Sequence, residues 1–226
     1  MTTDTNERDD LFTHIHKALR LALFDITAQA GRTDWADNAE VEALGDQWRP
    51  LLALLQAHTG HEDNHILRLL DPYEPATTEP TSEQHRDLDD LLDDLAHRFE
   101  AALADPHPSV GLDLYRDLAR FVAAYLPHLH DEETRVMARI WDLCRDDEIA
   151  ATRVAFMADT TPDVTTTSLR YLLPALDRPT RRALIARLAA AAPPPVVEMA
   201  LGIAERVLDD ATFADLHAAA TAPGKA

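Results

Sequence analysis

The sequence is poor in the residues that make hairpins, disulfides and membrane spans. Only 6 of its 226 residues are glycine, and neither Asn-Gly nor Asp-Gly occurs, so β-hairpins are not indicated. The one cysteine, Cys144, excludes an internal disulfide, and its neighbours Trp141 and Leu143 indicate a core thiol rather than a nucleophile. The sequence has no run of 18 apolar residues and does not start like a signal peptide, so we expect a soluble cytoplasmic protein.

Basic residues are also scarce, and the shortage is confined to one part of the chain. Residues 1–149 carry 13 Lys and Arg against 32 Asp and Glu, whereas residues 150–226 carry 8 of each. A strongly acidic region repels nucleic acid and anionic lipid, so we expect neither as a partner. We therefore expect two parts, residues 1–148 and residues 149–226.

Helix-forming residues dominate the composition, and their spacing predicts an all-α fold. Apolar residues at helical spacing predict four long helices, at about residues 7–29, 34–70, 81–104 and 108–145. Pro50 and Pro127 lie inside two of these segments, where we expect a kink or, at Pro50, the start of a separate helix. Because the connections are short, the helices are expected to form an up-down-up-down four-helix bundle.

In the last part of the chain, residues 149–226, the sequence pattern predicts several short helices separated by proline-containing breaks. It holds a single histidine, His217, and no polar cluster at helical spacing. We therefore expect an appended structural or partner-binding region.

A polar group interrupts the apolar face of the second predicted helix. His58, His61, Glu62 and His65 are spaced i, i+3, i+4 and i+7, so they share the helix face that also carries Leu55. Burying such groups without partners is costly, and metal coordination is one remedy. The alternative is a solvated polar patch near the helix end.

The His-x-x-x-Glu spacing of His58 and Glu62 recurs on the fourth predicted helix as His128 and Glu132. His16 and His85 also occupy apolar positions on the first and third helices. A lone histidine on such a face is more often a core residue than a ligand, but one inward histidine from each of four helices predicts a common site. Imidazole and carboxylate ligands without thiols suit iron or manganese.

These motifs resemble those of the haemerythrin-like, or HHE cation-binding, family. The resemblance covers about residues 8–147 and is carried by Ile15-His16-Lys17-Ala18-Leu19-Arg20, His58-x-x-His61-Glu62-Asp63, Glu83-Gln84-His85 and His128-x-x-x-Glu132. It implies a four-helix bundle with two non-haem iron ions joined by an oxo or hydroxo bridge. The implied ligands are four terminal histidines and two bridging glutamates, which map onto His16, His58, His85, His128, Glu62 and Glu132.

The sequence departs from the oxygen-carrying haemerythrins on two helices. Those proteins place two histidines one turn apart on the third helix, whereas this chain has Asp89 four residues after His85. They also place an aspartate five residues after the last histidine, where this chain has Glu132 at four. These departures argue against dedicated oxygen carriage. His61 is a candidate for the missing ligand, and His65 is expected behind the ligands or in the core.

Two functions are compatible with the resemblance. The first is a redox metalloprotein that binds dioxygen, peroxide or nitric oxide, with decomposition of peroxide as an associated enzymatic activity. The second is an iron or oxygen sensor, or an iron store, that signals to a protein partner through the C-terminal helices. Tyr125, which shares the inner face with His128, is expected to pack in the core, with a hydrogen bond to a bound ligand as the alternative.

Overall fold

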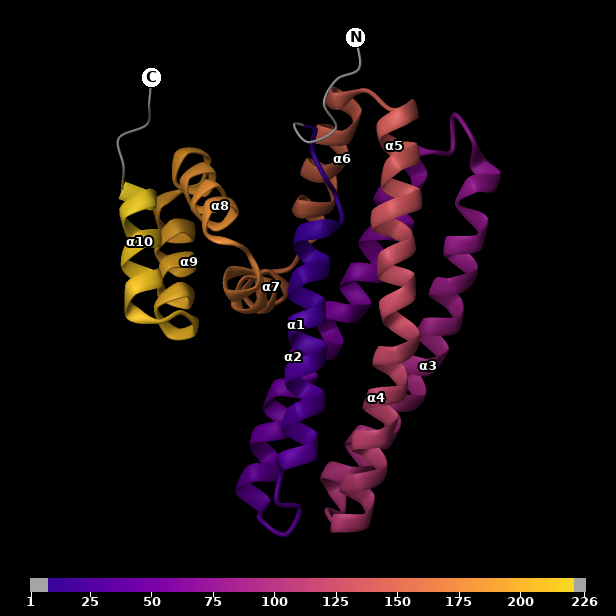
Figure 1. Ribbon diagram of the computed structural model, residues 1–226, viewed down its shortest axis with the longest axis vertical. Coiled ribbons are helices and arrows are strands. Elements are labelled where there is room, and N and C mark those ends of the chain that lie inside the picture. Colours follow the sequence, from indigo (N-terminus) through magenta and orange to yellow (C-terminus); the bar gives the residue numbers. More distant parts are fainter. Residues whose placement is uncertain (1–7, 222–226) are drawn as a thin grey trace.

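The computed structural model describes residues 8–221, and every regular element in that range is helical (Figure 1). Four long helices run alternately up and down beside one another and form a bundle, as the sequence predicts. They are α1 (Thr13–Arg32), α2 (Asn38–His61), α3 (Glu79–Ala104) and α4 (Pro108–Asp131). No helix within residues 8–221 is long and apolar enough to cross a membrane.

Local hydrogen bonds set the ends of these helices. The carboxylate of Asp10 accepts from the backbone N–H groups of Phe12 and Thr13, so α1 begins at Thr13 and not near residue 7 as predicted. The side chain of Asp37 accepts from the N–H of Ala39 and caps α2. The connection from α2 to α3 contains the short 3-10 turn Pro75–Thr77, and α3 starts at Glu79, two residues earlier than expected.

The core of the bundle is a continuous apolar cluster from the inner faces of all four helices. Trp48 of α2 stacks on Phe99 of α3 at 4.4 Å between ring centroids, and both side chains are fully buried. Pro50 lies within α2 and Pro127 within α4, and both helices continue through these prolines. The structure therefore contradicts the separate helix start that was one expectation at Pro50.

Two π turns follow α2 and α4 at equivalent positions. Glu62–Ile66 follows α2 and leads into a 3-10 turn, Leu67–Leu69, while Glu132–Val136 follows α4 and leads into α5 (Met137–Leu143). In each turn the first carbonyl accepts from the N–H five residues later, that of Leu67 or Met137. A π turn adds one residue to the helical turn and shifts the inward-facing positions that follow it.

Helix α6 (Asp146–Asp159) packs against the π turn and the 3-10 turn that follow α2. Its Ile149 is fully buried in a second apolar cluster, which also contains Phe12 of the chain start and Ile140 of α5. Arg153 of α6 pairs with Asp9 at 2.6 Å. The boundary expected between residues 148 and 149 falls inside α6, and α6 packs against the bundle.

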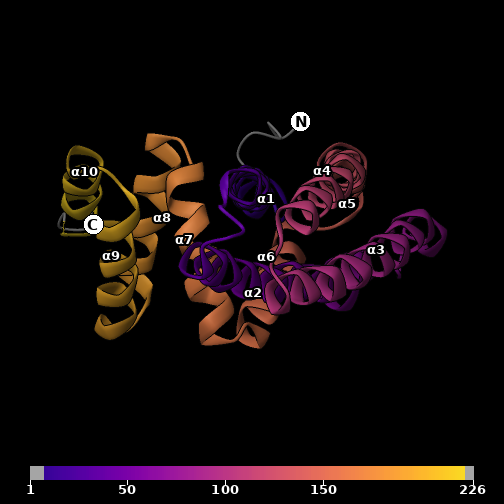
Figure 2. The ribbon, with the colours of Figure 1, turned by 90° about the horizontal axis from the view of Figure 1, so that it is seen from below.

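The four remaining helices form a regular array. They are α7 (Pro162–Ala175), α8 (Arg178–Ala191), α9 (Pro194–Val207) and α10 (Asp210–Thr221). Counted from α6, each helix begins 16 residues after the one before it. Helix α7 packs on α1 and α2, α9 packs on α7, and α10 packs on α8, so the array extends outward from the bundle (Figures 1 and 2).

The array is also a sequence repeat of 32 residues. Eight residues of the α7–α8 unit recur at the same positions of the α9–α10 unit. They are Pro162, Val164, Leu169, Leu176, Asp177, Thr180, Leu184 and Ala186, which recur as Pro194, Val196, Leu201, Leu208, Asp209, Thr212, Leu216 and Ala218. The caps repeat as well, because the carboxylates of Asp177 and Asp209 each accept from the N–H and hydroxyl groups of the threonine three residues later. Helices stacked in this manner, each unit on its neighbour, are typical of helical repeat proteins.

Candidate metal centre

Four histidines and two glutamates meet in the middle of the bundle. They are His16, His58, Glu62, His85, His128 and Glu132, and none of them is more than 5% exposed. Helix α1 supplies His16, α2 supplies His58, α3 supplies His85 and α4 supplies His128. Each glutamate is the first residue of a π turn, one helical turn after a histidine.

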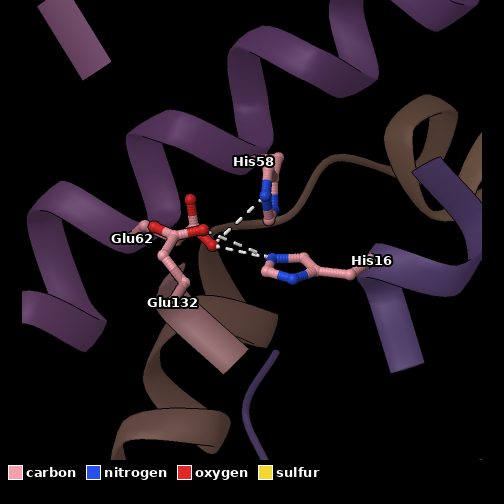
Figure 3. A group of neighbouring side chains, drawn as sticks. All are labelled: His16, His58, Glu62 and Glu132. Carbon is pink, nitrogen blue, oxygen red and sulfur yellow. Dashed lines mark hydrogen bonds and ion pairs between the residues drawn. The ribbon is translucent and has the colours of Figure 1, made fainter. Parts of the chain in front are cut away.

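The six residues form two overlapping groups with possible ligand atoms no more than 4.8 Å apart. One group is His16, His58, Glu62 and Glu132, and the other is Glu62, His85, His128 and Glu132. Figure 3 shows the first group converging from three separate segments of the chain. Each group thus has two histidines of its own, and both carboxylates belong to both groups.

All four histidines direct Nε2 toward the carboxylates. In the first group, Nε2 of His16 and of His58 lie 3.4 and 3.2 Å from Oε1 of Glu62. In the second, Nε2 of His85 lies 3.1 Å from Oε1 of Glu132, and Nε2 of His128 lies 3.3 Å from Oε2. This orientation places the nitrogen lone pairs and the carboxylate oxygens around a common interior.

The outer nitrogens of three of these histidines are held by partners behind the centre. Nδ1 of His16 lies 3.1 Å from Glu133, and Nδ1 of His85 lies 2.7 Å from Asp63. Nδ1 of His128 lies 3.0 Å from Oε1 of Gln84. An ionised carboxylate or an amide oxygen can only accept, so each Nδ1–H donates and Nε2 is left free to bind a metal ion.

The sequence reasoning did not identify these three supporting side chains. Asp63 and Glu133 each follow a ligand glutamate directly, and Glu133 is also held by Arg20 through two hydrogen bonds of 2.6 and 3.0 Å. The available signal was the repeated pair of acidic residues at the end of each His-x-x-x-Glu motif.

The structure places His61 and His65 outside both groups. An uninterrupted α-helix would bring positions 58, 62, 65 and 69 to one face, but the π turn shifts the inward positions to Ile66, Leu67 and Leu70. His65 therefore points toward α6, where Nε2 lies 2.7 Å from Asp159. This position corrects the expectation that His65 lies behind the ligands or in the core.

His61 is half-buried beside α6 and does not face the centre. Its ring stacks on Phe156 at 5.8 Å between centroids. It is the last residue of α2, one position before Glu62, so it points away from the inner face on which Glu62 lies. The expected seventh ligand is thus absent from the two groups within the described residues.

Burial and neighbouring charges shift the pKa values of the histidines in opposite directions. For His16 and His85, burial lowers the pKa, but hydrogen bonds to carboxylates outweigh it and raise the pKa to about 9 and about 10. Burial, followed by the charges of the other histidines, lowers the pKa of His58. Burial also lowers the pKa of His128 to about 4, against the opposing charge of Glu132.

The carboxylates of the centre are costly to bury together. Burial first, and then the charge of Glu132, raises the pKa of Glu62. Oε2 of Glu62 and Oε2 of Glu132 have no hydrogen-bond partner within residues 8–221. Buried acceptors of this kind require a cation or a proton, so the donor set fits bound metal ions.

A family model described as the Hemerythrin HHE cation binding domain matches residues 8–140 of the sequence. The chain belongs to this family. The match covers the bundle, both π turns and all six residues of the centre, whereas the α7–α10 array lies beyond it. No curated protein and no solved structure gives a significant match. For this member of the haemerythrin family, membership and the buried His and Glu cluster together indicate metal binding.

Proposed function

We propose that the bundle holds two iron ions and binds a small diatomic molecule or peroxide at them. The observation that carries this proposal is the pair of overlapping groups, in which two different histidines on each side share both Glu62 and Glu132. One ion would be held by His16, His58 and the glutamates, and the other by His85, His128 and the glutamates. His61 is not part of the proposed ligand set.

The donor types support iron over softer metals. Imidazole and carboxylate ligands suit iron and manganese, whereas structural zinc sites and copper(I) sites are commonly built with thiolates. The single thiol, Cys144, lies in the second apolar cluster near α6 and not among the ligands. Two divalent or trivalent ions would also neutralise the two buried carboxylates, whose negative charges otherwise repel each other.

The number of ligands supports an open position for a small molecule. Two six-coordinate ions offer about twelve positions, and four imidazoles with two bridging carboxylates fill about eight of them. Bound iron supplies a redox-active Lewis acid, to which dioxygen, peroxide or nitric oxide binds. The protein's part is to hold the imidazoles in one tautomer and to exclude larger substrates with the surrounding Leu, Phe and Tyr side chains.

Metal analysis and the visible spectrum test this proposal directly. Protein expressed with added iron is expected to contain about two iron atoms per chain, and its spectrum is expected to change on addition of azide, peroxide or nitric oxide. One zinc per chain, or no metal, would contradict the di-iron centre. A spectrum untouched by all three reagents would show that the metal positions are closed, and would leave a structural role. Consumption of added peroxide, followed over time, tests for enzymatic turnover.

A second candidate function is a sensor that signals through the C-terminal helices to a protein partner. It is favoured by the contacts of α6 with the segment that carries Glu62: His61 stacks on Phe156, and His65 pairs with Asp159. Helix α7 in turn packs on α1 and α2, which carry His16 and His58. The sensor predicts that metal removal increases amide exchange in α6 and α7. Equal exchange in the two forms would contradict it.

A further inference from the structure

Tyr125 places a hydroxyl group without a partner beside the candidate centre. The residue is 3% exposed and lies on α4, three positions before His128. Its ring stacks on Phe121 at 5.3 Å and lies 5.8 Å from the ring of His128, tilted by 59°. Within residues 8–221 its hydroxyl has no hydrogen-bond partner.

Packing alone does not account for this hydroxyl. A buried O–H that makes no hydrogen bond is destabilising, and a phenylalanine would fill the same space among Phe121 and His128 without that cost. Buried polar groups are almost always satisfied, so an unsatisfied one indicates a partner of another kind.

The other unsatisfied buried side-chain atoms show where that partner belongs. Three of them, Nε2 of His58 and Oε2 of Glu62 and of Glu132, are atoms of the candidate ligands. The remaining one, Nε1 of Trp48, lies almost three helical turns before His58 on α2 and stacks on Phe99. Tyr125 also lies beside the candidate ligands, because its ring is 5.8 Å from that of His128 and its phenol interacts electrostatically with Glu62 and Glu132.

The phenol of Tyr125 is available as a hydrogen-bond donor on the side of the bundle that carries His128. A neutral phenol has one O–H to donate. The ring of Tyr125 lies next to His128, which belongs to the group formed by His85, His128 and the two glutamates.

We propose that Tyr125 donates a hydrogen bond to the small molecule bound at the centre and thereby sets which molecules are held. The inference rests on the proposed di-iron function. Molecules whose outer atom accepts a hydrogen bond strongly, such as peroxide or the azide anion, gain from this contact. Nitric oxide, a weak acceptor, gains little, so Tyr125 is a specificity-determining residue rather than a metal ligand.

Replacement of Tyr125 with phenylalanine in the full iron-loaded chain tests the assignment. Azide affinity, measured by titration of the visible spectrum, is expected to fall about 10-fold in Tyr125→Phe, the loss of one hydrogen bond to a charged acceptor. Nitric oxide affinity is expected to change less than about threefold. Tyr171→Phe, which removes the hydroxyl of a buried tyrosine on α7, is the control and is expected to leave both affinities unchanged.

A spectroscopic measurement separates a hydrogen bond from a change in packing. The infrared band of bound azide is expected to shift between H2O and D2O in the wild type and in Tyr171→Phe, and not in Tyr125→Phe. Equal azide affinity and an equal isotope shift in Tyr125→Phe, with iron content and azide binding normal in the wild type, would overturn this inference and leave the proposed function standing.

Two further outcomes are also decisive. A wild-type protein without iron, or without any response to azide, would overturn the proposed function and this inference with it. For the metal-free form, Tyr125→Phe is expected to melt at the same temperature as the wild type or higher, because the hydroxyl has no partner there. A lower melting temperature would reveal a structural partner for the hydroxyl and would overturn the inference whatever the iron content.

Discussion

Asp63 lies 2.7 Å from Nδ1 of His85, although the two residues belong to different helices of the bundle. Glu133 holds Nδ1 of His16 in the same manner at 3.1 Å. Each supporting carboxylate directly follows a glutamate of the candidate centre, so one short segment supplies a candidate ligand and also orients a histidine of another helix. The arrangement is the same on both sides of the centre and joins α2 to α3 and α4 to α1.

Removal of a supporting carboxylate is expected to weaken metal binding without removing a ligand. Asp63→Ala and Glu133→Ala are each expected to lower iron affinity about 10- to 100-fold, because the imidazole loses its fixed tautomer and orientation. Affinity is measured by competition with a chelator of known strength. Asp90→Ala, on the exposed side of α3, is the matched control. Unchanged affinity in both site variants would show that the histidines need no support.

Removal of a central glutamate is expected to have a larger effect. Glu62→Ala and Glu132→Ala are each expected to abolish iron binding and its visible spectrum, because each carboxylate belongs to both groups of ligands. His61→Ala is the informative comparison, since His61 stacks on Phe156 instead of facing the centre. Loss of about half the iron in His61→Ala would return His61 to the ligand set.

Metal removal is expected to destabilise the protein. The metal-free form is expected to melt roughly 10 °C below the iron-loaded form, because binding at a thousandfold excess over Kd contributes about 4 kcal/mol to a domain of this size. Scanning calorimetry of both forms measures the difference. Equal melting temperatures would indicate that the buried carboxylates are satisfied without metal.

The metal-free protein is expected to lose stability as the pH rises above 6.5. The pKa of His16 is raised to about 9 and that of His85 to about 10, so the folded form binds more protons than the unfolded form in this range. The stabilisation from these two groups is fully present below pH 6.5 and is lost as the pH passes 9 to 10; the raised pKa of Glu62 acts in the same direction. Melting temperatures between pH 6.5 and 9 test this sign.

The iron-loaded form provides the control for that series. Metal binding requires neutral imidazoles and ionised carboxylates, so iron affinity is expected to rise with pH over the same interval. The gap in melting temperature between the two forms should therefore widen from pH 6.5 to 9. If the difference in melting temperature instead becomes smaller, His16 and His85 are not protonated at neutral pH in the metal-free form.

The two repeated helix caps of the array are expected to contribute similarly to the free energy of unfolding. Asp177→Ala and Asp209→Ala are each expected to lower the free energy of unfolding by about 1 kcal/mol, the usual cost of losing a helix N-cap. Urea denaturation measures the change. Iron content and azide binding are expected to stay at wild-type values, since both residues lie outside the bundle. A loss of iron would show that the array supports the centre directly.

The sequence predicts the bundle well because its four helices are long and carry apolar residues at regular spacing. Leu88, Leu92, Leu95 and Phe99, for example, all lie on the buried face of α3. The positions of His61 and His65 were not predictable in the same way, because an ideal period of 3.6 residues does not anticipate the π turn at Glu62–Ile66. The 32-residue repeat is also a weak signal in the sequence, because the eight residues that its two units share are separated by side chains that differ.

That repeat allows the C-terminal region to change its length by whole units, which the four-helix bundle cannot do. Because α9 packs on α7 and α10 on α8, one unit added to the end by tandem duplication would find the same kind of neighbour and would leave the six central residues in place. The array can therefore lengthen or shorten by whole units without disturbing the candidate metal centre. In this architecture, the length of the C-terminal region is independent of the geometry of the bundle.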